Sequence, residues 1–404
     1  MKPTLLFVLF LTMLTSCSCQ RKSALEKPVQ VTWTESDSIP ASFGNISKGV
    51  SAAFVGFQND KLVVAGGCNF PNTPAANGGK KVFYNDILTF DGKTWTKAGE
   101  LPRELAYGAS VNLPDVLLCI GGRNNDFFSA SVFSLTFDKK SGKALIDSLP
   151  ALPVKMDNFG GAVLDSVIYV VGGNQNGAPS ADVWELDLRR KNGWVKLPSI
   201  PSRPLIQPLA IAQNGALYVF GGYDNPRKIS ADFYSKKTTN DTAAFVSQAV
   251  WKYTPKTKTW TKTADYPAGK EGYSLSGGAA APIADSLILT FSGVNQSVFE
   301  EALNRNFFLS HYADSQDKKT LEKLNAEAKM YLFHASDWYK FNPRLMLFNT
   351  KNNTWQTLWD FPQAALAGAS AVNAGNIVYV VNGELKPGIR TPRIGKITWT
   401  TTQK

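Results

Sequence analysis

The chain has 404 residues, of which 44% are hydrophobic and 12% aromatic, and it contains 32 glycines and 22 prolines. This composition excludes a disordered chain and suits many short strands joined by tight turns better than long helices. The net charge of +11 favours acidic ligands or surfaces, although a solvated basic surface is the ordinary alternative. Lysines and arginines are scattered and form no basic stripe with interleaved aromatics, which argues against nucleic-acid binding.

The first residues are typical of a targeting segment. Lys2 precedes an apolar stretch, residues 5–14, that is too short to cross a bilayer as a helix, and small residues follow it. We therefore predict a signal region over residues 1–19 and a short linker over residues 20–30. The Leu-Thr-Ser-Cys stretch ending at Cys17 resembles a bacterial lipobox, whose cysteine is acylated; a plain secretory peptide with a chance cysteine is the alternative. Both predict export to the periplasm or cell envelope, with membrane attachment only through a lipid on Cys17.

Two landmarks recur along the rest of the chain, six times each. The first is a β-rich run that ends in a pair of small residues, and the second is an aromatic or aliphatic residue seven positions before a proline. The small pairs lie at residues 66–67, 121–122, 172–173, 221–222, 292–293 and 382–383. The second landmark runs from Trp33 to Pro40, Trp95 to Pro102, Ile146 to Pro153, Trp194 to Pro201, Trp260 to Pro267 and Trp355 to Pro362.

About four strands fit into each repeat of roughly 50 residues, which is the pattern of a kelch blade. We therefore predict an all-β protein in which residues 31–404 form one six-bladed kelch-type β-propeller. The repeats begin with a lone strand near Val31 and end without its equivalent, so the N-terminal strand is predicted to complete the last blade. Such a pairing removes two exposed sheet edges that would otherwise invite aggregation.

One segment, about residues 296–340, breaks the period inside the fifth blade. Leu321, Leu324, Ala328 and Tyr331 recur there at helical spacing, and charged residues fill the other face. Long insertions in repeat proteins map to one face, often the binding face, so a helical cap over one end of the ring is predicted. A structural decoration without a ligand role is the alternative, because surface insertions cost little.

Polar residues follow the glycine pairs and are expected at one rim of the propeller, because equivalent loops emerge on the same side. Amides with charged and aromatic neighbours can hydrogen-bond the hydroxyls of a sugar while stacking on its apolar faces. The alternative is that asparagine merely suits turns after strands. The predicted substrate-binding residues are Asn69, Arg123, Asn124, Asn174, Asn295, Gln296 and Lys386.

Glu384 and Arg390 stand apart from the other rim residues. Between them, Pro387 and Gly388 favour a turn that folds Arg390 back toward Glu384. A carboxylate beside an arginine stays ionised near neutral pH and can take a proton, while the arginine can hold a substrate carboxylate. An ordinary loop ion pair is the alternative.

The stretch N-G-E-L-K-P-G-I-R-T, residues 382–391, resembles the signature of the bacterial N-acetylneuraminate epimerases, also called sialic acid mutarotases, which are exported six-bladed kelch propellers. Similar motifs are G-V-N-Q-S-V-F at 293–299, K-L-N-A at 323–326, A-G-G-C-N-F at 65–70 and A-Y-G at 106–108. The order is rotated, since the blade with the glutamate comes last. The chain therefore resembles the cyclically permuted branch of that family, and a closed ring explains why permutation is tolerated.

The resemblance implies that Glu384 is the catalytic base, that Arg390 is its essential partner, and that sialic acid is the substrate, with no cofactor and no metal. The sequence departs from the family at two arginines. The arginine before A-Y-G is Leu105 here, with Arg103 two residues earlier, and a second arginine is displaced to Arg203. These departures bear on how the sugar carboxylate is bound.

A non-catalytic kelch propeller that binds a glycan or a protein is the main alternative, because fold alone does not define activity. A copper oxidase of similar architecture needs histidine ligands, and only His311 and His334 exist, both in the insertion. The sequence leaves the oligomeric state open, with a homodimer among the options.

Overall fold

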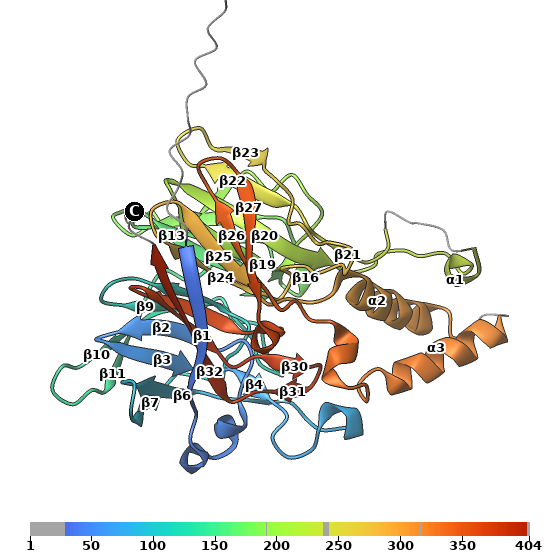
Figure 1. Ribbon diagram of the computed structural model, residues 1–404, viewed down its shortest axis with the longest axis horizontal. Coiled ribbons are helices and arrows are strands. Elements are labelled where there is room, and N and C mark those ends of the chain that lie inside the picture. Colours follow the sequence, from blue (N-terminus) through green and yellow to red (C-terminus); the bar gives the residue numbers. More distant parts are fainter. Residues whose placement is uncertain (1–28, 191, 237–241, 315–316, 402–404) are drawn as a thin grey trace, which may run out of the picture.

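The computed structural model describes residues 29–190, 192–236, 242–314 and 317–401. The predicted signal region, Cys17 and the linker up to residue 28 lie outside the described residues. The prediction of an all-β protein is confirmed, since strands make up most of the regular structure (Figure 1). Across the described ranges, no helix combines the length and apolarity that a membrane span needs.

Most strands belong to six antiparallel sheets, each with a path of four strands. The first holds β2 (Phe54–Gln58), β3 (Lys61–Ala65), β6 (Asp86–Phe90) and β7 (Trp95–Glu100). The second holds β8 (Ala109–Asn112), β9 (Leu117–Ile120), β10 (Val132–Phe137) and β11 (Ala144–Ser148). The third holds β13 (Gly160–Leu164), β14 (Val167–Val171), β17 (Val183–Asp187) and β18 (Val195–Leu197).

The other three sheets repeat this plan. The fourth holds β19 (Ile206–Gln213), β20 (Ala216–Asp224), β22 (Val250–Thr254) and β23 (Thr259–Lys262), with β21 (Phe245–Val246) paired to β20. The fifth holds β24 (Ala279–Ile283), β25 (Leu287–Phe291), β26 (Arg344–Asn349) and β27 (Thr354–Asp360). The sixth holds β28 (Ser370–Ala374), β29 (Ile377–Val381), β32 (Arg393–Thr401) and β1 (Val29–Ser38).

The sixth sheet joins the two ends of the described chain. β1 pairs antiparallel with β32, so that Trp33 lies opposite Ile397. The Trp33 ring stacks on Phe361 at 6.1 Å and contacts Phe291 edge-on at 6.4 Å, which links this sheet to the fifth. A strand far from β32 in sequence therefore supplies both ladder hydrogen bonds and core packing.

The first strand of each sheet contacts the first strands of both neighbouring sheets. Just before or at the start of these strands, six residues share a backbone with positive φ: Ala52, Tyr107, Asn158, Gln207, Gly277 and Gly368. The N–H of each donates to the carbonyl of the preceding member, and the N–H of Ala52 donates to Gly368, over distances of 2.7–3.4 Å. The six hydrogen bonds form a closed ring that fixes how the sheets meet.

Small residues on these inner strands allow the sheets to approach closely. A Cβ on Gly161 would lie 2.6 Å from the Cβ of Ala109, and one on Gly160 would lie 2.8 Å from Ala210. Farther out, aromatic residues fill the space between sheets, as where Trp355 lies 5.9 Å from Phe220 of the neighbouring sheet. The core thus consists of apolar layers between adjacent sheets.

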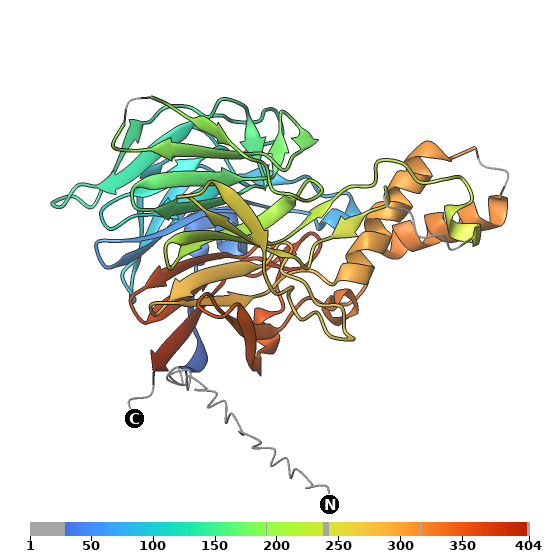
Figure 2. The same cartoon turned by 90° about the horizontal axis from the view of Figure 1, so that it is seen from above.

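The insertion contains α2 (Gln296–His311), α3 (Lys318–Met330) and η3 (Ser336–Tyr339), between β25 and β26. Asn295 caps α2 by accepting from the Val298 N–H, and Asp317 caps α3 through Thr320. Leu321 and Leu324 of α3 pack with Phe308 of α2. The helices extend from the same side of the molecule as the hairpin of β30 (Glu384–Lys386) and β31 (Ile389–Arg390) (Figures 1 and 2).

The remaining elements are short. They are the strands β4 (Cys68–Asn69), β5 (Val82–Phe83), β12 (Met156–Asp157), β15 (Asn174–Gln175) and β16 (Ala178–Pro179), the helix α1 (Phe233–Lys236), and the 3-10 helices η1 (Ala41–Lys48), η2 (Ala75–Asn77) and η4 (Pro362–Ala364). β4 pairs with β5, and β15 pairs with both β12 and β16. These hairpins follow the glycine pairs that end the second strand of a sheet.

Candidate active site

A cavity of about 460 Å³ is lined by residues of the inner strands of five sheets, β2 excepted, and by residues just before the inner strand of every sheet except the fourth, where the lining begins within β19. Phe299 and Tyr331 from the helical insertion, together with Phe341, also line it, as does Glu384 of the last hairpin. The inserted helices therefore contribute to this site, in keeping with the predicted cap. Apolar aromatic rings with a few polar groups are typical of a small-molecule site.

The hairpin of β30 and β31 brings Glu384 and Arg390 together. The two residues are direct partners in the ladder, and Pro387 and Gly388 form the turn between the strands. Gly388 has φ +85, and a Cβ there would lie 2.6 Å from that of Ala75, so the turn needs a glycine. The ion pair expected from the spacing is present, with Arg390 Nη2 2.5 Å from Glu384 Oε1.

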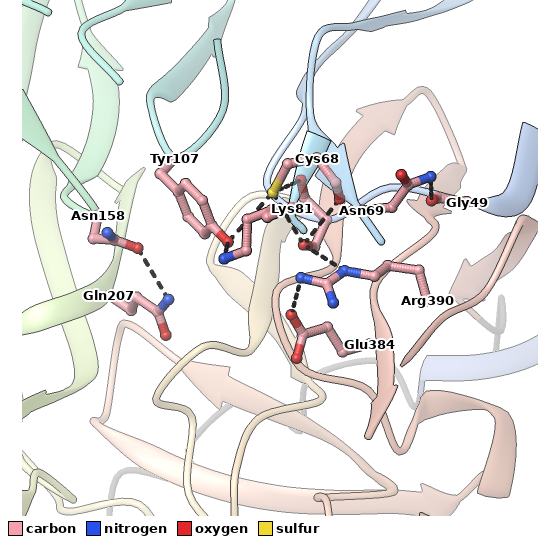
Figure 3. Close-up of polar contacts among 10 residues, drawn as sticks. Gly49, Cys68, Asn69, Lys81, Tyr107, Asn158, Gln207, Glu384 and Arg390 are labelled. Atoms are coloured by element: carbon pink, nitrogen blue, oxygen red, sulfur yellow. Dashed lines mark hydrogen bonds and ion pairs between the residues drawn. The ribbon is translucent and has the colours of Figure 1, made fainter. Parts of the chain in front are cut away.

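Arg390 lies behind Glu384, away from the open space. Its side chain is only 2% exposed, whereas that of Glu384 is 22% exposed and lines the cavity. Figure 3 shows the Arg390 guanidinium beside the Glu384 carboxylate. The guanidinium donates from Nε to Ser51 Oγ at 3.1 Å and lies 5.1 Å over the Phe70 ring, while Nη1 is buried and has no hydrogen-bond partner among the described residues. This geometry suits an arginine that orients and charge-balances the carboxylate.

Burial dominates the electrostatics of Glu384. Desolvation raises the pKa of its carboxyl above the ordinary value, and the charges of Arg390 and Lys81 oppose this shift only in part. The expectation that arginine alone would set the ionisation of Glu384 thus left out desolvation. A carboxyl with a raised pKa is a stronger base once it is ionised, which suits proton transfer.

A second polar cluster lies beside this pair. The Tyr107 phenol oxygen accepts from Lys81 Nζ at 2.9 Å and from Cys68 Sγ at 3.3 Å (Figure 3). Tyr107 lines the cavity, and Lys81 Nζ also lies 5.7 Å over Phe70. The sequence analysis missed both Lys81 and Tyr107. The A-Y-G motif at 106–108 was a signal for Tyr107, whereas no motif marked Lys81.

Amides line another part of the cavity wall. Gln207 Nε2 donates to Asn158 Oδ1 at 3.0 Å (Figure 3). Asn158 Nδ2 donates in turn to Asp157 Oδ1 at 2.7 Å. Asn158 and Gln207 both line the cavity. Neither was predicted as a site residue, because the predicted amides were taken from the loops after the glycine pairs rather than from the turns before the inner strands.

The side chains of the first three predicted substrate-binding residues contact neighbouring protein groups. Asn69 is buried, donates to the carbonyls of Asn45 and Gly49, and accepts from the Tyr84 hydroxyl. Asn124 accepts from the N–H groups of Asp126 and Phe127, and Arg123 lies 5.0 Å over the Phe128 ring. None of the three is among the residues that line the cavity.

The other four predicted binding residues also have local partners. Asn174 donates to Asp157 at 2.7 Å, and Asn295 caps α2 and donates to the Glu271 carbonyl. Gln296 accepts from Gln248 Nε2 and donates to Glu300 Oε1, and Lys386 donates to the His334 carbonyl. The structure thus brings Glu384 and Arg390 together and leaves these amides and the lysine outside the cavity lining.

The displaced arginines do not reach the cavity lining either. Leu105 is part of the apolar core, and Arg103 lies 5.1 Å over the Phe127 ring. Arg203 pairs with Asp224 at 3.0 Å and lies 5.1 Å over Phe245. Among the described side chains, no group of three or more histidines, cysteines, aspartates or glutamates is placed to hold a metal ion.

Comparison with known proteins gives three findings. A model of the N-acetylneuraminate epimerase family matches residues 16–144 and 149–404. N-acetylneuraminate epimerase of Salmonella arizonae is 30% identical over 254 residues, which cover 62% of this chain and 58% of that protein; the Escherichia coli O1:K1 / APEC protein is 27% identical, covering 67% and 66%. The solved structure of YjhT aligns with a TM-score of 0.50 and 25% identity, covering 63% of this chain and 67% of that chain.

The fold and site define an all-β protein in which a carboxylate, backed by a buried arginine, faces a cavity that residues of six sheets and their turns line. Because the family match extends over nearly the whole sequence, the chain belongs to the N-acetylneuraminate epimerase family. The pairwise alignment spans only 58% of the Salmonella relative's length.

Proposed function

We propose that the protein interconverts the α and β anomers of N-acetylneuraminate by opening and reclosing the sugar ring. One observation carries this proposal: Glu384 faces the cavity while Arg390 holds it from behind at 2.5 Å. Family membership supports the choice of substrate, because the relatives carry the name of this reaction. A volume of about 460 Å³ also suits a monosaccharide.

The proposed scaffold is a six-bladed kelch-type propeller that β1 closes by completing the last blade. Three observations support it: six sheets that each contain a path of four strands, the β1–β32 ladder, and the closed ring of backbone hydrogen bonds through Ala52 and Gly368. In this arrangement the cavity lies on the propeller axis, and the inserted helices flank its opening.

In the proposed mechanism, Glu384 removes the proton of the anomeric hydroxyl while the ring oxygen takes up a proton. The pyranose opens to its keto form, rotation exposes the other carbonyl face, and reclosure gives the opposite anomer. Arg390 keeps the carboxylate oriented and balances its charge, which is a positioning role. This assignment differs from the sequence-based expectation that Arg390 holds the sugar carboxylate, because the guanidinium is enclosed.

The experiment that tests this function is proton NMR of freshly released α-N-acetylneuraminate with and without the protein. We expect micromolar protein to accelerate anomer decay by about 100- to 10,000-fold per site, the range of general acid–base catalysis. An unchanged decay rate contradicts the proposal. Decay that stays unchanged although the sugar binds would favour the alternative of a non-catalytic glycan-binding propeller.

Export and lipid anchoring through Cys17 are also part of the proposal, supported by the targeting pattern of residues 1–19. We expect the full-length protein to fractionate with membranes and a Cys17→Ser variant to appear in the soluble fraction after export. Mass spectrometry of the N-terminal peptide of the processed protein should detect an acyl group on Cys17. A soluble wild-type protein cleaved elsewhere contradicts the anchor, and sedimentation velocity of that material tests the homodimer.

A further inference from the structure

Tyr107 occupies an unusual backbone position at the cavity wall. Its φ is +63, a region that bulky residues rarely adopt, and it is the only aromatic member of the ring of six positive-φ residues described above. Its N–H donates to the Ala52 carbonyl at 3.0 Å, and its carbonyl accepts from the Asn158 N–H at 2.7 Å. Both neighbouring sheets thereby fix where the Tyr107 ring stands.

The hydrogen bonds recorded for the Tyr107 phenol among the described residues do not involve its hydroxyl hydrogen. A phenol oxygen can accept two hydrogen bonds and donate one. Lys81 Nζ at 2.9 Å and Cys68 Sγ at 3.3 Å supply the two that it accepts. Among the described residues no acceptor is recorded for the hydroxyl hydrogen, so this hydrogen is free to be donated to a ligand in the cavity that Tyr107 lines.

Burial keeps the Tyr107 hydroxyl protonated at neutral pH, while the neighbouring Lys81 can stabilise the phenolate that forms when the proton is transferred. Burial above all, with a further contribution from the Glu384 carboxylate, raises the pKa of Tyr107 well above its ordinary value, so the proton is present at neutral pH. The Lys81 ammonium touches the phenol oxygen and lies 5.1 Å from the ring centre, where it stabilises negative charge that develops on that oxygen.

We propose that Tyr107 donates the proton that the sugar ring oxygen requires, with Lys81 as its positioning and charge-stabilising partner. The inference rests on the proposed mutarotase function. Glu384 and Tyr107 come from different sheets, line the same cavity, and lie close enough for their charges to interact (Figure 3). The two groups therefore suit the two proton transfers of one ring opening.

The step balances in both directions. On opening, Glu384 takes the anomeric proton, the O–H electron pair forms the C=O bond, the bond from the anomeric carbon to the ring oxygen breaks, and that oxygen takes the Tyr107 proton. On reclosure, the sugar hydroxyl returns its proton to the Tyr107 phenolate as it attacks the carbonyl carbon. The carbonyl oxygen then takes back the proton from Glu384, so no co-reactant is consumed.

The test compares Tyr107→Phe with wild type, Glu384→Gln and Tyr266→Phe in the anomer assay. Tyr266 is a buried tyrosine outside the cavity lining that loses a single hydrogen bond, to Asn342, and so is a matched control. Phenylalanine keeps the edge contact of residue 107 with Phe83, at 6.2 Å, so the variant should fold. We expect its turnover rate to fall at least about 100-fold and its KM to change by less than about threefold, with Tyr266→Phe close to wild type.

A pH profile separates a proton donor from a structural tyrosine. The wild-type rate above the protein-free rate should decline at alkaline pH as Tyr107 loses its proton, and Lys81→Met should move that decline to higher pH because the cation no longer favours the phenolate. This readout remains if Tyr107→Phe fails to fold.

The outcomes distinguish the two proposals. Should wild type give no acceleration, the mutarotase function fails. If wild type is active and Glu384→Gln inactive while Tyr107→Phe keeps the full rate, only the role of Tyr107 is overturned. The role of Tyr107 is also overturned if Tyr107→Phe loses sugar binding and turnover to the same extent. It is overturned as well if Lys81→Met leaves the alkaline decline of the rate at the same pH as in wild type.

Discussion

Replacing Glu384 by glutamine is expected to reduce the anomerisation rate by about 100- to 10,000-fold, to near the rate without protein. Glutamine preserves the size of the side chain and an oxygen that can accept from Arg390 Nη2, now 2.5 Å from the carboxylate. It cannot take up the anomeric proton. Sugar binding, measured by calorimetry, should survive because the cavity lining is otherwise unchanged.

The pH dependence gives an independent signature of the same group. Glu384 acts as a base only when ionised, and burial raises the pKa of its carboxyl, so the rate should fall as the pH drops through a value above the ordinary carboxyl range. The residual rate of Glu384→Gln should lack this acid limb. The raised pKa of Glu384 also affects the stability of the fold. Because the folded state disfavours the ionised carboxylate, the contribution of Glu384 to the free energy of unfolding decreases as the pH rises through its pKa.

Glu271→Gln is the matched control for this substitution. Glu271 also pairs with an arginine, Arg344, at 3.0 Å, but it lies outside the cavity lining. Its rate and acid limb should match those of wild type. A Glu384→Gln variant that keeps wild-type activity, or a Glu271→Gln variant that loses it equally, would remove the basis for assigning the base to Glu384.

Deleting β1 is expected to abolish the folded protein rather than to reduce its activity. Without residues 29–38, the long strand β32 loses its ladder partner and becomes an exposed edge, which promotes aggregation. The deletion also removes Trp33, which packs on Phe361 and covers the backbone at Gly395, where a Cβ would lie 2.6 Å from the indole. We expect insoluble material, or a chain without a cooperative thermal transition by circular dichroism.

The control for this deletion starts the chain at Val29 and keeps all of β1. It should unfold cooperatively, with a melting temperature close to that of the full-length chain, because every described contact is retained. A truncated chain starting at Ile39 that folds and melts like this control would contradict the closing role of β1. Supplying residues 29–38 as a separate peptide should partly restore solubility if the strand acts through pairing alone.

Much of the architecture followed from recurrence in the sequence. The small-residue pairs and the tryptophan-to-proline spacing predicted strands in places where strands are observed, because turns and alternating apolar strands are specified locally. The strand ends were not predicted: β20 continues through the glycine pair at 221–222 as far as Asp224. Glu384 and Arg390 were also predictable as a pair. They are only six positions apart and a Pro-Gly turn lies between them, so their meeting needs no information from elsewhere in the chain.

The rest of the site could not be derived in this way. The predicted rim amides include Asn69, Asn174 and Asn295. In the structure their side chains donate hydrogen bonds to nearby backbone carbonyls or, for Asn174, to a carboxylate. Whether a rim amide points toward a ligand or braces its own loop depends on these local competitors, which a repeat pattern does not record.

The sequence by itself determined which segments become strands and that an acid and an arginine meet in one hairpin, since both depend on residues close together in the chain. Only the tertiary structure decided which groups share the cavity. Tyr107 and Glu384 line the same cavity although they come from distant parts of the chain, and Lys81 lies behind Tyr107. Burial, rather than the adjacent arginine, sets the direction in which the pKa of Glu384 moves. Convergence and desolvation are properties of the packed ring, so no local pattern carries them.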